Sequence, residues 1–167
     1  MVKDVNAQII GAAGFRWREF FRSSTAKKLG IDNTPQDPKI YDNIEYLARK
    51  VLQPVRDHFG APVRVTSGYR SPRLNIAVGG SPASFHALGC AADIEPLDKN
   101  ARFTVRDIFT YIHDNLPYTE LIAEELPNGW VHVALQKGRE KEKQLKCKLL
   151  GGSVRRATYA EIMRAFA

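Results

Sequence analysis

The chain has 167 residues, with 25 Lys and Arg against 18 Asp and Glu, a formal net charge of +7, 44% apolar and 26% charged residues. This length and composition predict one globular domain and exclude a disordered or fibrous chain and a membrane span of about 20 apolar residues. Two cysteines exclude a disulfide scaffold and a cysteine-rich zinc finger, and the positive charge favours a polyanionic partner without selecting among nucleic acid, membrane and bacterial wall polymers.

Helices are predicted in the first sixty residues. Residues 15–30 indicate a short helix or turn around their aromatic side chains, then a second short helix that ends at Gly30. The longest predicted helix covers residues 38–59, with Asp37 placed to cap it. Pro54 is expected to kink this helix near its last turn. Its apolar residues recur at spacings of three and four and predict one buried stripe of Ile40, Ile44, Leu47, Val51, Leu52, Val55 and Phe59.

The middle of the chain combines two short strands with a long loop. Residues 63–66 predict a strand, and residues 91–94 predict another. The segment between them, residues 67–89, is rich in Gly, Ser and Pro and is expected to be a loop. A loop of this length in a compact domain is usually functional.

The remaining elements predict the fold class. A capping box at Thr104 begins a helix, and residues 121–126 and 130–135 are two strands of a hairpin. The tail, residues 137–148, holds six bases and two acids and is interpreted as a solvated face, and a last helix begins at Thr158. This order of elements predicts an α+β fold in which a small, mostly antiparallel sheet is packed with helices.

Three potential metal ligands are distinguished by their placement: His86, Asp93 and His132. Small residues between His86 and Asp93 allow the backbone to turn so that both side chains reach one ion. His132 has apolar neighbours on a predicted strand, which would present its ring from a rigid element. Two imidazoles and a carboxylate hold zinc with a fourth position open for water. Because such residues are common in any sequence, the surrounding motif decides the interpretation.

That motif resembles a known family. The resemblance rests on SGYRSPRLNIAVGGSPASFHALGCAADI, followed about forty residues later by WVHV. These segments are similar to the zinc D-alanyl-D-alanine carboxypeptidases, within the group that includes lysostaphin-type peptidases and the hedgehog signalling domain. The segment SSTA at residues 23–26 and GIDNTP at residues 30–35 resemble the bacterial and phage-borne branch. The resemblance implies one zinc peptidase domain over residues 1–167, with a motif-bearing core at 15–140 and a basic extension at 141–167.

The resemblance also implies roles for individual residues. His86, Asp93 and His132 match the zinc ligands of the family. Arg70, in the Ser-Gly-Tyr-Arg motif, is expected to bind the substrate carbonyl or to stabilise the developing oxyanion. Ser84 is expected either to bind a ligand or substrate by a hydrogen bond or to shape the turn.

The resemblance implies that the general base is a carboxylate on the strand that faces the last histidine. Glu124 and Glu125 are the candidates here. Strand alternation directs Leu121 and Ala123 toward the core, so we favour Glu124 as the residue that faces the cleft. Some relatives carry the acid three residues before the histidine, where this chain has Gly129.

The sequence therefore predicts a zinc-dependent metallopeptidase that acts on peptidoglycan stem peptides or cross-links, as a D-Ala-D-Ala carboxypeptidase or endopeptidase. The alternative is an inactive zinc-bearing module that binds the cell wall or has a structural role, and nucleic-acid binding is a minor alternative. We expect a monomer without a membrane span, whose basic surface would bind anionic wall polymers. With no evident signal peptide, we expect a phage-encoded or virion-associated protein, or one made in the cytoplasm and released.

Overall fold

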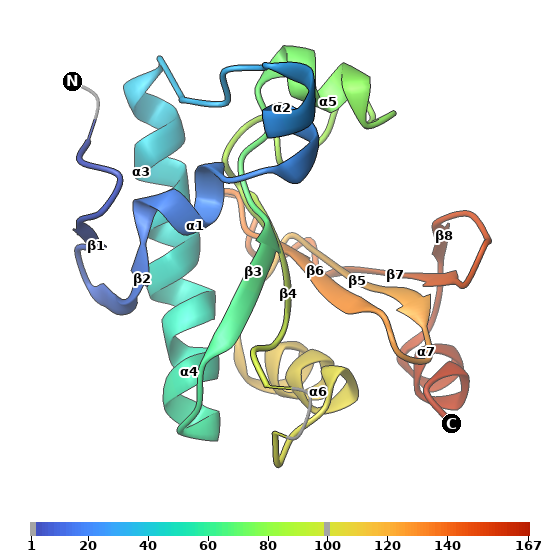
Figure 1. Cartoon of the computed structure of the whole chain (residues 1–167). Helices are drawn as coiled ribbons and strands as arrows, with labels where there is room; N and C mark the ends of the chain where they lie inside the picture. Colours follow the sequence, from blue (N-terminus) through green and yellow to red (C-terminus); the bar gives the residue numbers. More distant parts are fainter. Residues whose placement is uncertain (1–2, 99–100) are drawn as a thin grey trace.

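The computed structural model describes residues 3–98 and 101–167 and has an α+β architecture (Figure 1). Within these ranges, one sheet has the strand order β3-β4-β6-β5-β7-β8, and β1 pairs with β2 in a second sheet. Only β5 and β7 run parallel, so the predicted mostly antiparallel sheet is confirmed. The strands are β1 (Gln8–Ile9), β2 (Ala12–Arg16), β3 (Val63–Ser67), β4 (Ala91–Pro96), β5 (Glu120–Leu126), β6 (Trp130–Ala134), β7 (Gln144–Leu149) and β8 (Arg155–Arg156).

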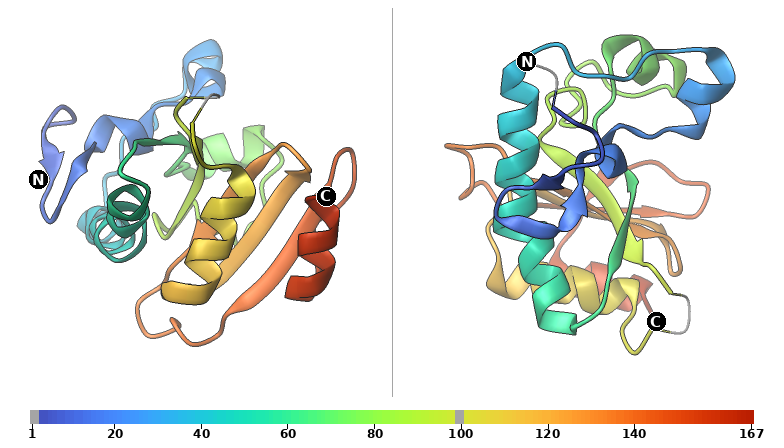
Figure 2. Two further views of the ribbon diagram at one scale, coloured as in Figure 1. Left: turned by 90° about the horizontal axis from the view of Figure 1, so that it is seen from below. Right: turned by 60° about the vertical axis from the view of Figure 1, so that its left-hand side comes forward.

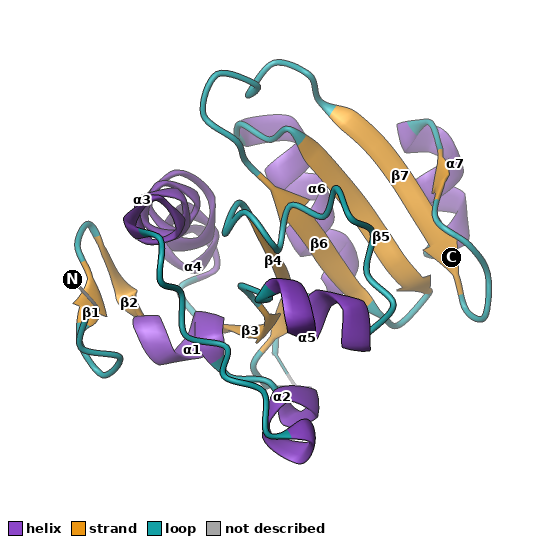
Figure 3. Ribbon diagram, turned by 90° about the horizontal axis from the view of Figure 1, so that it is seen from above, coloured by secondary structure: helices purple, strands orange, loops and turns teal. Residues whose placement is uncertain are grey.

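The helices lie on both sides of the large sheet. They are α1 (Trp17–Phe21), α2 (Ser24–Leu29), α3 (Pro38–Leu47), the π-helical segment η1 (Ala48–Leu52), α4 (Gln53–Phe59), α5 (Pro72–Ala77), α6 (Val105–Asn115) and α7 (Tyr159–Ala165). Seen from below, α6 and α7 cover one face of the sheet (Figure 2). Seen from above, α5 and the loops beside it lie on the other side (Figure 3). No helix in the described ranges combines the length and the apolar character that crossing a membrane requires.

Strand alternation gives the sheet an apolar face and a polar face. In the register of the three central strands, Ala92, Val133 and Leu121 form one row and face the same side. They belong to the core together with Ile108 and Phe109 of α6. The next row, one residue along each strand, must point to the opposite side. The sheet therefore presents a second set of side chains away from its core.

That second row contains Asp93, His132 and Ile122, which are register partners on β4, β6 and β5. Lys146 on β7 is the register partner of Ile122. On β5, Glu120 and Glu124 lie two residues before and after Ile122, so they point to the same side as Ile122. Polar side chains that are far apart in the sequence thus share one face of the sheet.

The long helix formed by α3, η1 and α4 confirms the predicted boundaries and contains a π-helical segment before Pro54. Asp37 accepts a hydrogen bond from the Lys39 backbone, and Gly60 ends the helix with a φ of 60°. Pro54 has no N–H, and its ring crowds the carbonyl four residues earlier. Directly before Pro54 the helix widens into η1, where the Gln53 N–H donates to the Ala48 carbonyl. The wider turn accommodates the proline within a continuous column.

Three parts of the structure differ from the sequence-based expectations. The predicted loop between β3 and β4 contains the helix α5, capped by Ser71 with Pro72 in its first turn. The basic segment interpreted as a solvated face contains β7, which adds to the large sheet beside β5. The small β1–β2 sheet was not predicted. The hairpin of β5 and β6, the strands β3 and β4, and the capped helices α2, α6 and α7 match the predictions.

The outer edge of the large sheet is formed by β3, whose other side pairs with β4. Two arginine side chains approach its backbone. Arg56 Nη2 donates to the Val63 carbonyl at 2.7 Å, and Arg22 Nη2 donates to the Val65 carbonyl at 3.2 Å. These two carbonyl groups therefore accept hydrogen bonds from guanidinium groups rather than from another strand.

Candidate metal centre

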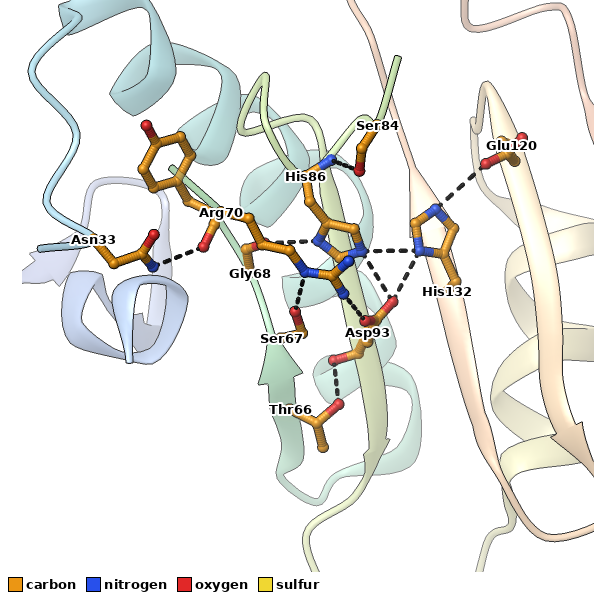
Figure 4. A network of polar contacts seen from close by, with 11 residues as sticks. Asn33, Thr66, Ser67, Gly68, Arg70, Ser84, His86, Asp93, Glu120 and His132 are labelled. Atoms are coloured by element: carbon orange, nitrogen blue, oxygen red, sulfur yellow. Dashed lines mark hydrogen bonds and ion pairs between the residues drawn. The ribbon is translucent and has the colours of Figure 1, made fainter. Parts of the chain in front are cut away.

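Three buried side chains, His86, Asp93 and His132, converge on one point of the polar face (Figure 4). Asp93 and His132 are direct neighbours on adjacent strands, and His86 reaches them from the loop that precedes β4. Their exposed fractions are 3% for His86, 5% for Asp93 and 6% for His132. The strand pairing thus brings together two of the predicted ligands, and the loop supplies the third.

The spacing of their donor atoms suits a single cation. His132 Nδ1 lies 2.8 Å from Asp93 Oδ1, and His86 Nε2 lies 3.2 Å from each of these two atoms. A tetrahedral zinc ion with bonds of about 2.0 Å separates its ligands by roughly 3.3 Å. Electron pairs that face one another at such distances repel unless a cation or a proton lies between them. The donor set and its spacing therefore fit a metal ion.

A backbone carbonyl sets the orientation of His86. His86 Nδ1 lies 2.6 Å from the Gly68 carbonyl oxygen. Because a carbonyl oxygen only accepts, Nδ1 carries the proton, and Nε2 directs its lone pair at the other two ligands. Gly68 is itself confined, since a Cβ at this position would lie 2.6 Å from both the Cα and the carbonyl oxygen of Phe20. The close packing of α1 thus fixes the carbonyl that orients the histidine.

Arg70 holds the other oxygen of Asp93. Its Nη2 donates to Asp93 Oδ2 at 3.0 Å, and its Nε donates to Ser67 Oγ at 3.1 Å. The sequence analysis assigned Arg70 to the substrate and did not foresee this ion pair. Within the described chain, Nη1 of Arg70 forms no hydrogen bond, so the same guanidinium retains a donor for another group. Arg70 therefore orients a metal ligand and keeps positive charge at the centre.

The carboxylate of Glu120, which the sequence did not indicate as a site residue, lies beside His132. His132 Nε2 is buried without a hydrogen bond of good geometry and lies 3.5 Å from Glu120 Oε1. The other carboxylate oxygen of Glu120 forms an ion pair with Lys146 of β7. Alternation along β5 places Glu120 on the polar face, but its pairing with Lys146 depends on a strand that was not predicted.

The charges of the centre shift the pKa values of its members in the metal-free protein. Burial lowers the pKa of His86. Burial opposes ionisation of Asp93, yet the two histidines hold its pKa well below the ordinary value. Burial also opposes protonation of His132, but Asp93 and Glu120 raise its pKa to about 9. Burial opposes ionisation of Glu120 as well, yet His132 and Lys146 lower its pKa to about 2. A concentration of negative charge thus surrounds the two imidazoles.

The structure separates the two candidate bases. Glu124 is half-buried on the polar face, and burial, followed by the charge of Asp93, raises its pKa. Its carboxylate forms no hydrogen bond or ion pair with the residues described. Glu125 has a φ of 54°. Its carboxylate forms an ion pair with Lys148 at 2.5 Å and accepts a hydrogen bond from the Gly151 N–H at 3.4 Å. Of the two candidates, Glu124 is therefore the one whose carboxylate has no bonding partner in the described part of the chain and whose pKa is raised by burial and by the nearby charge of Asp93.

The hairpin also explains why no acid stands three residues before His132. Gly129 occupies that position, and a Cβ there would lie 1.8 Å from the Glu124 carbonyl oxygen. No side chain fits without moving the backbone of β5. An acid at this position is thus excluded here by the backbone of Glu124 itself.

Two polar residues hold the loops around the centre. Ser84 Oγ accepts from the His86 backbone N–H at 3.3 Å, which corresponds to the turn-shaping alternative. Asn33, 6% exposed, donates to the Phe21 and Tyr69 carbonyls, each at 2.9 Å, and accepts from the Ser71 N–H at 2.7 Å. Asn33 fixes the backbone on both sides of Arg70. The sequence indicates no such role for Asn33, because no local pattern reveals a buried loop asparagine.

A cavity of about 280 Å³ lies beside Arg70, between α2, α5 and the end of β3. Its lining residues are mostly polar, namely Arg22, Ser23, Ser24, Thr25, Thr66 and Ser67, together with the apolar Leu74 and Val78. The cavity has the size of an amino-acid side chain or a terminal residue of a peptide. Its donors favour an anionic or amide-bearing group.

Comparison with known protein families gives one match. The family model described as Peptidase M15 matches residues 13–134 of the chain. This range contains the three converging ligands together with Arg70 and Glu124. A comparison with curated proteins gives no significant match.

Proposed function

The chain belongs to the peptidase M15 family, a family of metallopeptidases, and from this premise we propose that it is a zinc peptidase acting on peptidoglycan. The scissile bonds would be peptide bonds of the stem peptides or of the cross-links, cut by a D-Ala-D-Ala carboxypeptidase or endopeptidase reaction. The observation that carries the proposal is the convergence of His86, Asp93 and His132 beside an unengaged carboxylate and an arginine.

Zinc is the metal that this donor set favours. Two imidazoles and one carboxylate are a common protein ligand set for catalytic zinc, which retains an open position. Cys90 and Cys147 are buried thiols outside the converging group, so softer ligands do not contribute. When bound, zinc lowers the pKa of water to about 7 and polarises a carbonyl group.

The residues of the chain supply the proton transfers and fixed charge. Glu124 is proposed to accept the proton of the attacking water and to return it to the leaving amine, and its raised pKa suits both steps. The free donor of Arg70 would hold the substrate carbonyl oxygen as negative charge develops there. The ion pair of Arg70 with Asp93 keeps this guanidinium in place before the substrate arrives.

The cavity beside Arg70 supports a short peptide as substrate. It would receive the residue on one side of the scissile bond, with Arg22 and the hydroxyl groups facing a carboxylate or amide. The net charge of +7 would attract the protein to anionic wall polymers. We further propose that it reaches the wall as a phage-encoded or virion-associated protein or by release from the cytoplasm.

The experiment is digestion of purified peptidoglycan, followed by mass spectrometry of the released peptides. We expect new amino groups and a defined mass change with the zinc-loaded protein, and loss of both after chelation or in His86→Ala. Cleavage that persists at full rate without metal would contradict the proposal. The alternative, an inactive wall-binding module, predicts zinc binding and sedimentation with the wall but no new termini. The unengaged Glu124 on the metal face supports the enzyme over this alternative.

A further inference from the structure

We infer that the C-terminal strand β7 completes the metal centre, because Lys146 holds Glu120 against His132 and thereby sets the orientation of that ligand. Lys146 lies outside the family-matched residues 13–134, whereas Glu120 and His132 lie inside them. The inference rests on the proposed function only in taking a metal ion as the occupant of the site. It assigns Lys146 and Glu120 as positioning residues rather than catalytic residues.

The contacts form a chain from β7 to the ligand. Lys146 Nζ forms an ion pair with Glu120 Oε2, and Glu120 Oε1 lies 3.5 Å from His132 Nε2 (Figure 4 shows the second contact). Glu120 is 8% exposed, and no other cation forms an ion pair with it in the described parts of the chain, apart from His132 itself. The carboxylate is therefore fixed between one lysine and one histidine.

The sheet register explains how a residue of β7 reaches a ligand of β6. Lys146, Ile122 and His132 are register partners on three adjacent strands and point to the same side. Glu120 precedes Ile122 by two residues and lies on the same side. One carboxylate oxygen of Glu120 pairs with Lys146 on β7, and the other lies near His132 on β6, each one diagonal position away across the sheet. The parallel pairing of β5 and β7 thus sets the contact.

The contacts from Lys146 through Glu120 to His132 select one tautomer of the His132 ring. A carboxylate that faces Nε2 favours the ring form that carries its proton there, which leaves the Nδ1 lone pair to face Asp93 and His86. A nearly buried carboxylate with one cationic partner removed is strongly disfavoured. Without Lys146, Glu120 would turn toward water, and His132 would lose the group that fixes its ring. The metal affinity should fall although every ligand is still present.

The test measures zinc affinity by competition with a chromogenic chelator, in the Lys146→Met variant and in three comparison variants. Loss of such outer contacts weakens metal binding by about 10- to 100-fold, so Lys146→Met and Glu120→Ala should each bind zinc at least about tenfold more weakly. Lys146→Arg, which keeps the charge, should bind within about threefold of wild type. Lys148→Met is the matched control, because Lys148 lies on the same strand but pairs with Glu125, and it should not change the affinity.

Two further readouts separate positioning from a general loss of structure. The visible absorption spectrum of the cobalt-substituted protein should shift in Lys146→Met and keep its wild-type form in Lys148→Met. The thermal unfolding of the metal-free variants shows whether the fold is intact. If Lys146→Met does not fold, the double variant Lys146→Met/Glu120→Gln avoids the unpaired buried charge and should still show the weaker affinity.

Equal zinc affinity in wild type and Lys146→Met, or the same loss in Lys148→Met, would overturn the inference. The outcome is distinct from that of the proposed function. A wild-type protein that binds zinc and loses affinity in Lys146→Met, but cuts no peptidoglycan, supports the inference and overturns the proposed function. A wild-type protein that binds no divalent metal overturns both.

Discussion

Replacing Gly68 with alanine tests whether the packing of α1 controls the metal centre. The added Cβ would lie 2.6 Å from two backbone atoms of Phe20, where ordinary contacts begin at 3.4 Å, so the two segments must separate by about 0.8 Å. Neither partner is a flexible side chain that can rotate away. Overpacking of this kind destabilises a protein by about 1–3 kcal/mol. For a domain of this size each kcal/mol lowers the Tm by about 2–4 °C, which gives a fall of roughly 2–12 °C.

The same displacement should reach His86. Its Nδ1 lies 2.6 Å from the Gly68 carbonyl, and a shift of about 0.8 Å along this bond would lengthen it to about 3.4 Å, beyond ordinary hydrogen-bond length. We expect zinc affinity to fall by about tenfold as the ring loses its fixed orientation.

Calorimetry of the metal-free protein measures the first effect, and competition with a chelator measures the second. Gly152→Ala is the control, because a Cβ there would meet its nearest atom, the Leu149 carbonyl oxygen, at 3.2 Å, and this glycine is exposed. A Gly68→Ala protein with wild-type Tm and wild-type zinc affinity would refute the reasoning.

Three further predictions concern titrating groups. Glu124→Gln should keep zinc but lower kcat by about 10²–10⁴, the usual contribution of a general base, whereas Glu125→Gln should retain most activity; steady-state assays with metal analysis compare them, and equal rates for both variants would contradict the assignment. Burial and the charge of Asp93 raise the pKa of Glu124, so activity should be full above this raised pKa and fall as the pH drops through it. The acidic limb of the kcat/KM profile should therefore lie above the ordinary glutamate pKa of 4.5. A limb at or below 4.5 would argue against Glu124 as the base. Burial raises the pKa of the Cys90 thiol to about 11, so iodoacetamide at pH 8 should leave it unmodified in the native protein and alkylate it after denaturation; rapid labelling of the native protein, mapped by mass spectrometry, would show that this thiol is accessible.

The elements that the sequence predicted are those specified by local chemistry. Asp37, Thr104 and Thr158 each cap the helix that the sequence assigned to them, because a capping side chain bonds to the backbone two or three residues away. The converging ligands were predicted from a motif rather than from periodicity. Alternation along β5 placed Glu124 on the side of the metal centre, since Leu121 and Ala123, which precede it and face the other side, belong to the core.

The elements that the sequence missed depend on contacts with distant residues. The segment containing Lys146 and Lys148 has the composition of a solvated surface, yet both lysines pair with glutamates of β5. Those pairs exist only after β7 has joined the sheet, so the charge pattern alone could not indicate a strand. The same limit applies to Asn33, whose three backbone partners come from separate segments.

The exclusion of a side chain at Gly129 has the same origin. The sequence shows only that Gly129 stands three residues before His132. The structure shows that the Glu124 carbonyl occupies the space that a Cβ would need. The proposed position of the base at Glu124 and the lack of space for a side chain at position 129 therefore both depend on one tight hairpin.

The guanidinium groups on β3 have a consequence for assembly. A β-strand at the end of a sheet invites pairing with another chain, which leads to domain swapping or fibril growth. Any incoming strand would have to displace Arg22 and Arg56 from the Val65 and Val63 carbonyls, exchanging charge-assisted bonds for neutral ones. The opposite border of the sheet ends in β8, which is only two residues long. The protein is thereby protected from uncontrolled polymerisation at both borders, by charge at one and by brevity at the other.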